Sequence, residues 1–503
     1  MITRRTVLKA VTAGAVTAFA GTIPGIRAFA AATALRVRRS VNTMALDDPD
    51  LATYRDFVGI MRAKPDTDPV SWVGFANQHG TATDFVFCPH GDWYFLPWHR
   101  GFVDMYERAA AALTKNPKFA MPYWDWNTLR QLPAAFTDPL YKGKANPLYV
   151  PGVGDAPSVV RNVLVGPNAL TDAMVGPAVM TKVYKETVYE RFGTSRSVDS
   201  SVTPPAVQTN DDAKWVPMGG GFQGTLESRP HNNVHNNIGG YMPQTNSPRD
   251  PIFMMHHSNI DRIWAYWNAL GRKNSTDPLW LNMPFTNNYL APTGTPYTKK
   301  VKDLLSTTAL GYTYDNLPKA APRILDPGRS ANLVALLHLA PTPKVKRFKA
   351  DTTETASVSA PFSTSVQLES AALKTTIEAA PETKQPSEVV ALISQLQIGD
   401  NVRAVRVFVN LDAANLDVPE TDPHFVTTLS FLHHSGGDDG AHAHHKSLPS
   451  TIVDLTETLQ NLSKANGLSG DHVTVQLVPV PAPGVAAGAV GKVVPASIEI
   501  ALI

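Results

Sequence analysis

The sequence has little cysteine, no basic tract and no long apolar run beyond its first residues. A single cysteine, Cys88, stands among 503 residues, which excludes intrachain disulfides. No stretch after residue 32 has about 18 consecutive apolar residues, so we expect no membrane span in the mature protein. The 45 Lys and Arg residues balance 43 Asp and Glu residues without clustering, so nucleic acid is not an expected partner.

The first 32 residues have the pattern of an export signal. Arg4 and Arg5 form a twin-arginine pair in TRRTVLK, and an Ala-rich, weakly apolar run and the small residues of AFAAA follow. This order of basic, apolar and small residues predicts a twin-arginine signal peptide over residues 1–32 and a periplasmic or secreted protein. Twin-arginine export carries folded proteins, which suits a protein loaded with a cofactor before it crosses the membrane.

Two regions of different texture follow the signal. Residues 33–318 are rich in aromatic residues and histidine, with helical periodicity over residues 102–115 and 250–270. A Pro-rich stretch over residues 319–344 reads as a linker. Residues 345–503 turn to Thr, Ser and Val, with alternating runs that read as strands at 404–411, 424–432, 472–480 and 497–503. We therefore expect a multidomain protein, a mainly α domain followed by an all-β, sandwich-like domain.

The 15 histidines are mostly clustered, which indicates a metal site. In PHNNVHNNIGG, His231 and His235 are four residues apart, a spacing that stacks their side chains on one face of a helix. A third ligand for this set would come from the adjacent pair His256 and His257, and the spacing does not choose between them.

A second set of three histidines can be assembled upstream. HGDWYFLPWHR contains His90 and His99 on either side of an aromatic stretch, and His79 precedes them as a plausible third ligand. Six imidazoles in two sets of three suit copper, with no carboxylate ligand and an open position on each ion. Zinc also binds three histidines, so ligand type alone does not decide, but zinc has no redox chemistry.

HGDWYFLPWHR with the following Glu107, and DPIFMMHHSNIDR with the following WAYW, resemble the two copper-binding signatures of tyrosinases and polyphenol oxidases, the type 3 copper family. PYWDWN, LRVRR, the pair Tyr312 and Tyr314 in GYTYD, and VRVFVNL in the β region also resemble this family, especially its plant-type members. The resemblance covers nearly all of the chain after the signal. We therefore expect a bacterial exported member with a plant-type C-terminal domain and a four-helix-bundle dicopper core.

The resemblance implies a ligand for each copper position. His256 would be a neighbour that packs or hydrogen-bonds, because the family's ligand is the second histidine of the pair. Cys88 matches a cysteine that in some members forms a thioether bond to the next ligand, His90; the alternative is a small buried apolar residue. The implied ligands are His79, His90 and His99 for the first copper and His231, His235 and His257 for the second.

The resemblance also implies an activity. The copper pair of the family binds O2 and oxidises o-diphenols to quinones, and some members first hydroxylate monophenols. Glu227 and Asn232 match a glutamate and an asparagine associated with this hydroxylation, where they would hold a water and accept the proton of the phenol. The alternative for Glu227 is a structural pair with Arg229 or another loop residue. We expect a tyrosinase acting on small phenols, with a role in melanin formation.

Other matched residues have supporting roles in this interpretation. Asp250 and Arg262 would anchor the helix that carries His257. In the family, a C-terminal β domain covers the copper site, and Phe431 and Leu432 are candidates for a plug. The family's phenylalanine gate is not evident in GGYMPQTNSPR. Five histidines at residues 433–446 form either a solvated loop or a place where copper is passed on.

Four other functions compete with the tyrosinase interpretation. A catechol oxidase or an o-aminophenol oxidase would use the same ligands without strong monophenol hydroxylation. A haemocyanin-like oxygen carrier would shield its copper from phenols and make no quinone. A zinc hydrolase is remote, because the sequence has no HExxH motif.

Overall fold

The computed structural model describes residues 34–503 except 83–85, 151–160, 163, 200–205, 208–220, 320–326, 341, 343–344, 352–360, 379–386, 433–447, 466, 469–470 and 483. Two expected features lie outside the described residues, the signal peptide and the loop of five histidines. Within the described ranges, no helix combines the length and the apolar character needed to cross a membrane.

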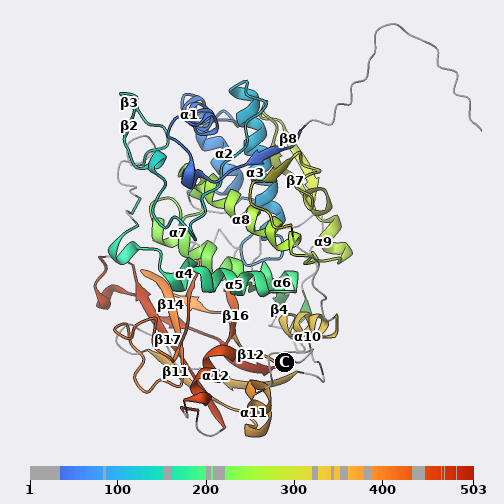
Figure 1. The fold of residues 1–503 in the computed structure, drawn as a ribbon, viewed down its shortest axis with the longest axis vertical. Coiled ribbons are helices and arrows are strands. Elements are labelled where there is room, and N and C mark those ends of the chain that lie inside the picture. Colours follow the sequence, from blue (N-terminus) through green and yellow to red (C-terminus); the bar gives the residue numbers. More distant parts are fainter. Residues whose placement is uncertain are drawn as a thin grey trace, which may run out of the picture. The chain divides into compact units, whose positions relative to one another are not determined.

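The helical part of the chain is organised around two long helices that pack against each other (Figure 1). These are α3 (Phe95–Leu113) and α8 (Ile252–Ala269), and both bury residues on nearly every side. Both helices were expected from their apolar periodicity, and both are confirmed. The other helices of this part are α1 (Pro49–Arg62), α2 (Trp72–His79), α4 (Asp172–Val175), α5 (Pro177–Lys185), α6 (Tyr189–Phe192), α7 (Asn232–Ile238) and α9 (Pro278–Asn282).

A buried ion network joins the first strand to these two helices. Strand β1 (Arg36–Arg38) pairs in parallel with β9 (Tyr312–Tyr314), which places Arg38 inside the core. Its guanidinium lies 2.8 Å from a carboxylate oxygen of Glu107 on α3 and 3.0 Å from one of Asp261 on α8. All three side chains are almost fully buried. Because buried charges are costly without partners, this network fixes the register of α3 against α8.

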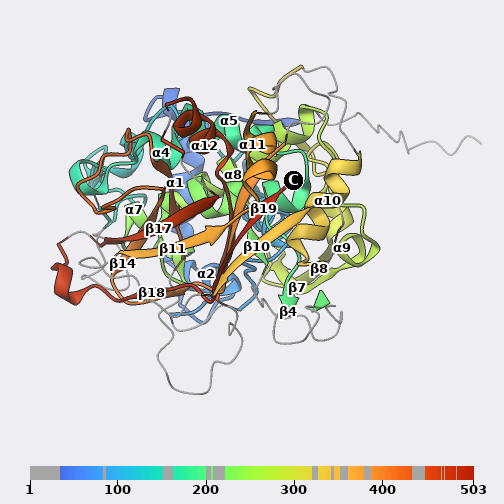
Figure 2. The same ribbon diagram turned by 90° about the horizontal axis from the view of Figure 1, so that it is seen from below.

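Two sheets form the C-terminal part of the chain (Figure 2). In one, the strand order is β10-β19-β12-β16-β6, and in the other it is β11-β17-β14-β15. Their strands are β6 (Phe222–Gln223), β10 (Lys346–Asp351), β11 (Phe362–Gln367), β12 (Val389–Ser394), β14 (Val402–Val409), β15 (Phe425–Ser430), β16 (Ser450–Asp454), β17 (His472–Pro481) and β19 (Ser497–Leu502), with helices α11 (Ser370–Glu378) and α12 (Thr456–Lys464).

Short strand pairs complete the fold. They are β2 (Leu140–Tyr141) with β3 (Lys144–Ala145), β4 (Val198–Asp199) with β5 (Ala206–Val207), β7 (Pro284–Leu290) with β8 (Pro296–Lys300), and β13 (Gln397–Ile398) with β18 (Val493–Val494).

The two large sheets share one apolar core, as a sandwich does. Alternate residues of β12, such as Ala391 and Ile393, contribute to this core together with alternate residues of β14, such as Val405 and Val407. The intervening residue Leu392 of β12 is buried on the opposite face of its sheet. β12 is therefore covered on both faces, which explains its continuous apolar sequence.

Part of that opposite face is covered by segments that the sequence did not assign to the β region. Helix α10 (Pro327–Leu337) lies within the expected linker, and its Leu336 and Leu337 join Leu392 in a separate apolar cluster. Strand β6 comes from the helical part of the chain and pairs in parallel with β16. The five-stranded sheet is therefore completed by a strand that directly precedes Glu227 and His231.

Candidate metal centre

The first histidine cluster lies where α2, the following loop and the start of α3 meet. His79 is the last residue of α2, His90 precedes α3, and His99 lies in its second turn. Their ligand nitrogens and the Sγ atom of Cys88 lie within 4.8 Å of one another, and all four residues are buried. The structure thus brings together the three residues expected to bind the first copper.

The second cluster is formed by α7, α8 and the turn before α7. His231 ends a π-helical turn, Glu227–His231, in which Pro230 has no N–H to donate to a helical bond. The rings of His231 and His235 have centroids 4.5 Å apart, as their four-residue spacing predicts. His256 and His257 of α8 complete this buried group, again with ligand atoms within 4.8 Å.

The two clusters face each other where α3, which carries His99, packs against α8, which carries His257. The rings of His99 and His257 stack with centroids 4.2 Å apart and planes inclined by 7°. The rings of His90 and His231 have centroids 5.7 Å apart. Two metal ions held by these sets would therefore be near neighbours, as a dinuclear site requires.

Backbone carbonyls fix the nitrogen that several rings present to a metal. A carbonyl only accepts hydrogen bonds, so an Nδ1 atom beside one carries the ring proton and the Nε2 lone pair is left for a metal. These contacts are 2.5 Å from His79 Nδ1 to Thr245 O, 2.8 Å from His99 Nδ1 to Phe95 O, and 2.5 Å from His235 Nδ1 to Met242 O.

Burial keeps the imidazoles in the neutral form that binds metals. Loss of hydration lowers the pKa of His99 to about 3 and that of His235 to about 4. The same cause holds the pKa values of His231, His256 and His257 well below the ordinary value for histidine. These rings are neutral at physiological pH, as metal ligands must be.

One hydrogen bond distinguishes His256 from His257. The indole N–H of Trp126 donates to His256 Nδ1 at 3.2 Å, so the neutral ring of His256 carries its proton on Nε2 and offers no lone pair there. The Nε2 atoms of His235 and His257 lie 3.2 Å apart, close to the roughly 3.3 Å expected for two nitrogens about 2.0 Å from one ion in tetrahedral geometry. The geometry therefore favours His257 as the ligand and His256 as a neighbour.

Cys88 lies against the ring of His90. Its Sγ atom is 3.4 Å from Nδ1 and 3.9 Å from Nε2 of that ring, the two nitrogens that flank Cε1. It is also 3.3 Å from Nε2 of His99. Burial raises the pKa of the thiol well above its ordinary value, so the group is a neutral thiol. The side chain is placed where a thioether to His90 could form.

Glu227 is fully buried beside the first cluster. One carboxylate oxygen accepts the backbone N–H of Gly91 at 2.8 Å, and the other accepts a short hydrogen bond from the hydroxyl of Thr194. It makes no ion pair with Arg229 among the described contacts, and the groups that hold it come instead from Gly91 and Thr194. Burial raises the pKa of Glu227 to about 8.

The asparagines of α7 connect the second cluster to the β region. Asn232 Oδ1 lies 2.8 Å from His231 Nδ1, while its Nδ2 donates to the carbonyl of Ser430 at 2.8 Å. One turn later, Asn236 Nδ2 lies 2.8 Å from the carbonyl of Phe431 and 2.7 Å from the hydroxyl of Ser430. The end of β15 is therefore docked on the helix that carries His235.

Phe431 does not have the position of a plug. Its side chain is buried in the apolar core shared by the two sheets, and only its backbone carbonyl faces α7. The expectation for Phe431 was wrong because the alternation of β15 continues through this residue and directs its ring into the sandwich. Leu432 is half-buried, and the histidine loop that follows lies outside the described residues.

Asp250 and Arg262 support α8 separately. The carboxylate of Asp250 accepts the N–H of Ile252 at 2.9 Å, which caps the start of α8, and lies 3.3 Å from the guanidinium of Arg161. Arg262 lies 3.4 Å from Asp125. Both anchor the helix as expected, with different partners.

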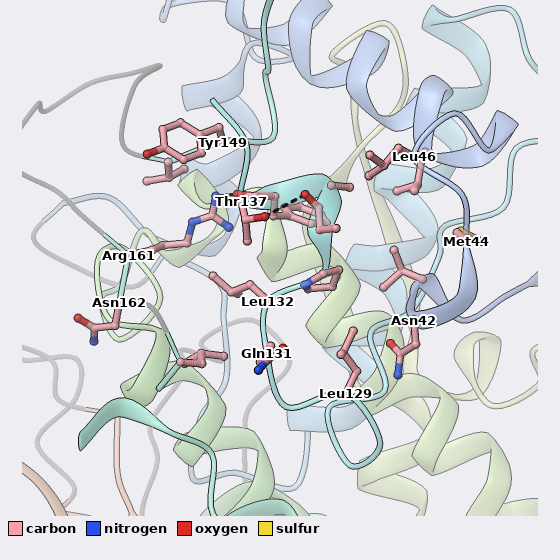
Figure 3. Close-up of a pocket in the computed structure, with 18 of the residues that line it drawn as sticks. Asn42, Met44, Leu46, Leu129, Gln131, Leu132, Thr137, Tyr149, Arg161 and Asn162 are labelled. Atoms are coloured by element: carbon pink, nitrogen blue, oxygen red, sulfur yellow. Dashed lines mark hydrogen bonds between the residues drawn. The ribbon is translucent and has the colours of Figure 1, made fainter. Parts of the chain in front are cut away.

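A cavity of about 800 Å³ lies beside Arg161, the ion-pair partner of Asp250 (Figure 3). In Figure 3 the Arg161 side chain reaches toward Thr137, with Leu132 below it. Its described lining is mostly apolar and includes none of the clustered histidines. This cavity is therefore separate from the metal centre.

Two parts of the site were not evident in the sequence. Thr194 and Gly91 hold Glu227 but lie far from it along the chain, so no spacing pattern reveals them. Asn236 could have been suspected, because it lies one turn beyond Asn232 in NNVHNN and shares its helix face.

The donor set fits copper. Each half of the site offers three buried imidazoles, and no described carboxylate joins either cluster. Borderline nitrogen donors with an open position suit copper. The carbonyl bonds to Nδ1 are the outer contacts that orient such ligands.

Two regions of the chain match known protein families. Residues 54–270 match the common central domain of tyrosinase, and residues 363–498 match the C-terminal domain of chloroplastic polyphenol oxidase. The first region contains all six candidate ligands, and the second contains most of the β sandwich.

Two curated relatives of this chain are plant proteins. (+)-Larreatricin hydroxylase of Larrea tridentata is 30% identical over 319 residues, and the match covers 56% of this chain and 49% of the relative. Polyphenol oxidase E of Solanum lycopersicum is 27% identical over 492 residues, and the match covers 90% of this chain and 75% of the relative. The chain spans about half the length of the curated relatives that it matches at 30% identity.

Solved structures share the fold. Latent apple tyrosinase is 25% identical, with a TM-score of 0.57 over 93% of this chain and 97% of that one. Recombinant latent aurone synthase is 21% identical, with a TM-score of 0.62 over 94% and 90%. These likenesses support the plant-type C-terminal domain, whereas the named relatives give no support to a bacterial source.

Proposed function

We propose, from the chain's membership of the tyrosinase and polyphenol oxidase family of copper oxidoreductases, that it hydroxylates monophenols at the ortho position and oxidises o-diphenols to o-quinones with O2. The family's cofactor is a pair of copper ions, which supplies O2 binding and electron transfer. The residues that would hold it are His79, His90 and His99 for one ion and His231, His235 and His257 for the other, with Cys88 as a thioether partner of His90.

Glu227 is the proposed base for the monophenol reaction. A phenol must lose its hydroxyl proton before it can react, and a buried carboxylate with a pKa of about 8 accepts a proton far more readily than an ordinary glutamate. Its hydrogen bond to Gly91 keeps it beside His90. Asn232 is the proposed partner that orients the water between Glu227 and the phenol. The buried Glu227 next to the first cluster is the observation that carries this proposal.

The docked β domain is proposed to act as an intramolecular lid. Asn232 donates its amide N–H to Ser430 in the docked state, so the same group is not turned toward a substrate water. All six candidate ligands are at most 7% exposed. Undocking of β15 from α7 would both open the site and release Asn232.

One observation favours a second candidate, an oxidase without strong monophenol hydroxylation. The amide of Asn232, the proposed water-orienting group, already donates to the carbonyl of Ser430 at 2.8 Å, so it does not orient a water for Glu227 while the β domain is docked. A catechol oxidase or an o-aminophenol oxidase needs no such base.

The experiment replaces Glu227 with glutamine and measures tyrosine hydroxylation and L-DOPA oxidation side by side. We expect the first activity to fall roughly 100-fold more than the second, because general-base catalysis contributes about that much. Glu190→Gln is the matched control, a buried glutamate on α6 that accepts from His338 at 2.7 Å. Equal loss of both activities would refute the assignment, and an unsubstituted, copper-loaded protein that makes no quinone would contradict the proposed oxidase function.

Further proposals concern organisation and location. Because the candidate ligands come from or adjoin α2, α3, α7 and α8, we propose a four-helix-bundle dicopper core within a catalytic domain over residues 33–318. Residues 319–344 would connect it to a lid domain over residues 345–503. The named relatives include chloroplastic proteins, and a twin-arginine signal at residues 1–32 would direct export of the folded enzyme. Quinone products would lead to melanin-like pigments.

A further inference from the structure

Thr194 holds the carboxylate of Glu227 from the side opposite Gly91. It is 1% exposed, and its hydroxyl donates a short hydrogen bond to Oε2 of Glu227. Gly91 N–H occupies Oε1. A carboxylate held at both oxygens has one orientation, and the charge-assisted bond from Thr194 favours its ionised form.

The position of Thr194 is fixed by the strand that precedes Glu227. Thr194 forms an antiparallel bridge with Gln223 of β6, and the neighbouring Ser195 N–H donates to the carbonyl of Phe222 at 3.0 Å. β6 in turn pairs with β16 of the β domain. The hydroxyl that holds Glu227 therefore belongs to a ladder that continues into the C-terminal sheet.

Few titratable groups face Glu227. They are Asp92, whose charge raises the pKa of Glu227, and Cys88, whose own pKa is raised by the charge of Glu227. Both residues are buried. Asp92 disfavours the charge on Glu227, and the Cys88 thiol is neutral. No described cation pairs with the Glu227 carboxylate. Hydrogen bonds are thus the main stabilisation of the Glu227 anion, and Thr194 supplies the only one from a side chain in the described structure.

We propose that Thr194 is a positioning residue that makes Glu227 an effective base for monophenol hydroxylation. This inference rests on the proposed function of Glu227. Without the hydroxyl, the carboxylate would keep its proton to a higher pH and could rotate about its bond to Gly91. Diphenol oxidation, which does not need Glu227, would be spared.

The test measures the pH profiles of tyrosine hydroxylation and L-DOPA oxidation by the full-length copper-loaded enzyme. Thr194→Val removes the hydroxyl with little change of shape, and we expect hydroxylation to fall at least about tenfold relative to oxidation. The ascending limb of the hydroxylation profile should also move to higher pH. Thr194→Ser keeps the hydroxyl and should restore both properties.

Thr225→Val is the matched control. Thr225, two residues before Glu227 in the chain, is also buried. Its hydroxyl donates to the half-buried Glu186 at 2.7 Å. It should leave the ratio of the two activities unchanged.

The possible outcomes separate this inference from the proposed function. If Thr194→Val lowers both activities equally, or changes neither, the inference is wrong even where Glu227→Gln is selective. If Thr225→Val has the same selective effect, the loss reflects general disruption and the inference is also wrong. If Glu227→Gln is not selective, the proposed base itself is wrong.

Discussion

Replacement of Asn236 by alanine should partly release the β domain from α7. Its Nδ2 donates to three acceptors of the β domain, the carbonyl of Phe431 at 2.8 Å, the hydroxyl of Ser430 at 2.7 Å and the carbonyl of Arg403 at 3.1 Å. A neutral hydrogen bond contributes about 1 kcal/mol net, and bonds that share one donor group do not add fully, so we expect a loss of about 2 kcal/mol. The equilibrium between docked and undocked forms should therefore shift about 30-fold.

The assay is the steady-state rate of catechol oxidation by the full-length protein without any activating treatment. If only undocked molecules admit the substrate, the rate should rise by up to about 30-fold. Copper content is measured in parallel, because Asn236 follows His235 directly. Asn282→Ala is the matched control, since its Nδ2 donates within α9 to Pro278 O at 2.9 Å. If the rate of Asn236→Ala is within twofold of the control at full copper content, the proposal that the β domain acts as a lid is wrong.

Two further predictions concern the ligands and the core. His257→Gln should leave about one copper per chain and His256→Gln about two, because Trp126 donates to His256 Nδ1; metal analysis after dialysis decides, and equal loss would overturn the assignment. Arg38→Met should lower the free energy of unfolding by about 3–5 kcal/mol in urea titrations, because it leaves Glu107 and Asp261 without a buried partner. The control Arg130→Met, whose partner Asp172 is 81% exposed, should cost less than about 1 kcal/mol, and a similar cost for both would contradict the role of the network.

The helices and strands near the centre were predictable because their patterns are local. Apolar periodicity identified α3 and α8, and alternation identified β14, β15, β17 and β19 to within a few residues. The ligand set was also predictable, since four of the eight clustered residues fall within two short signatures. Spacing alone could not separate His256 from His257; that distinction needs the bond from Trp126, which lies 130 positions away.

Features that depend on distant contacts were missed. Strand β6 has only two residues and forms through pairing with β16, so it is too short for an alternating pattern to predict it. The expected linker contains α10 because Leu336 and Leu337 find an apolar surface on the sheet. Thr194 meets Glu227 only once β6 is formed. These elements owe their conformation to tertiary packing rather than to local preference.

We propose above all that this chain hydroxylates monophenols at a copper pair beside Glu227. The most direct measurement supplies tyrosine and isotopically heavy O2 to the copper-loaded protein and analyses the L-DOPA formed, trapped with a reductant, by mass spectrometry. We expect one heavy oxygen atom in each molecule of product. Oxidation of added L-DOPA without any labelled product from tyrosine would contradict it.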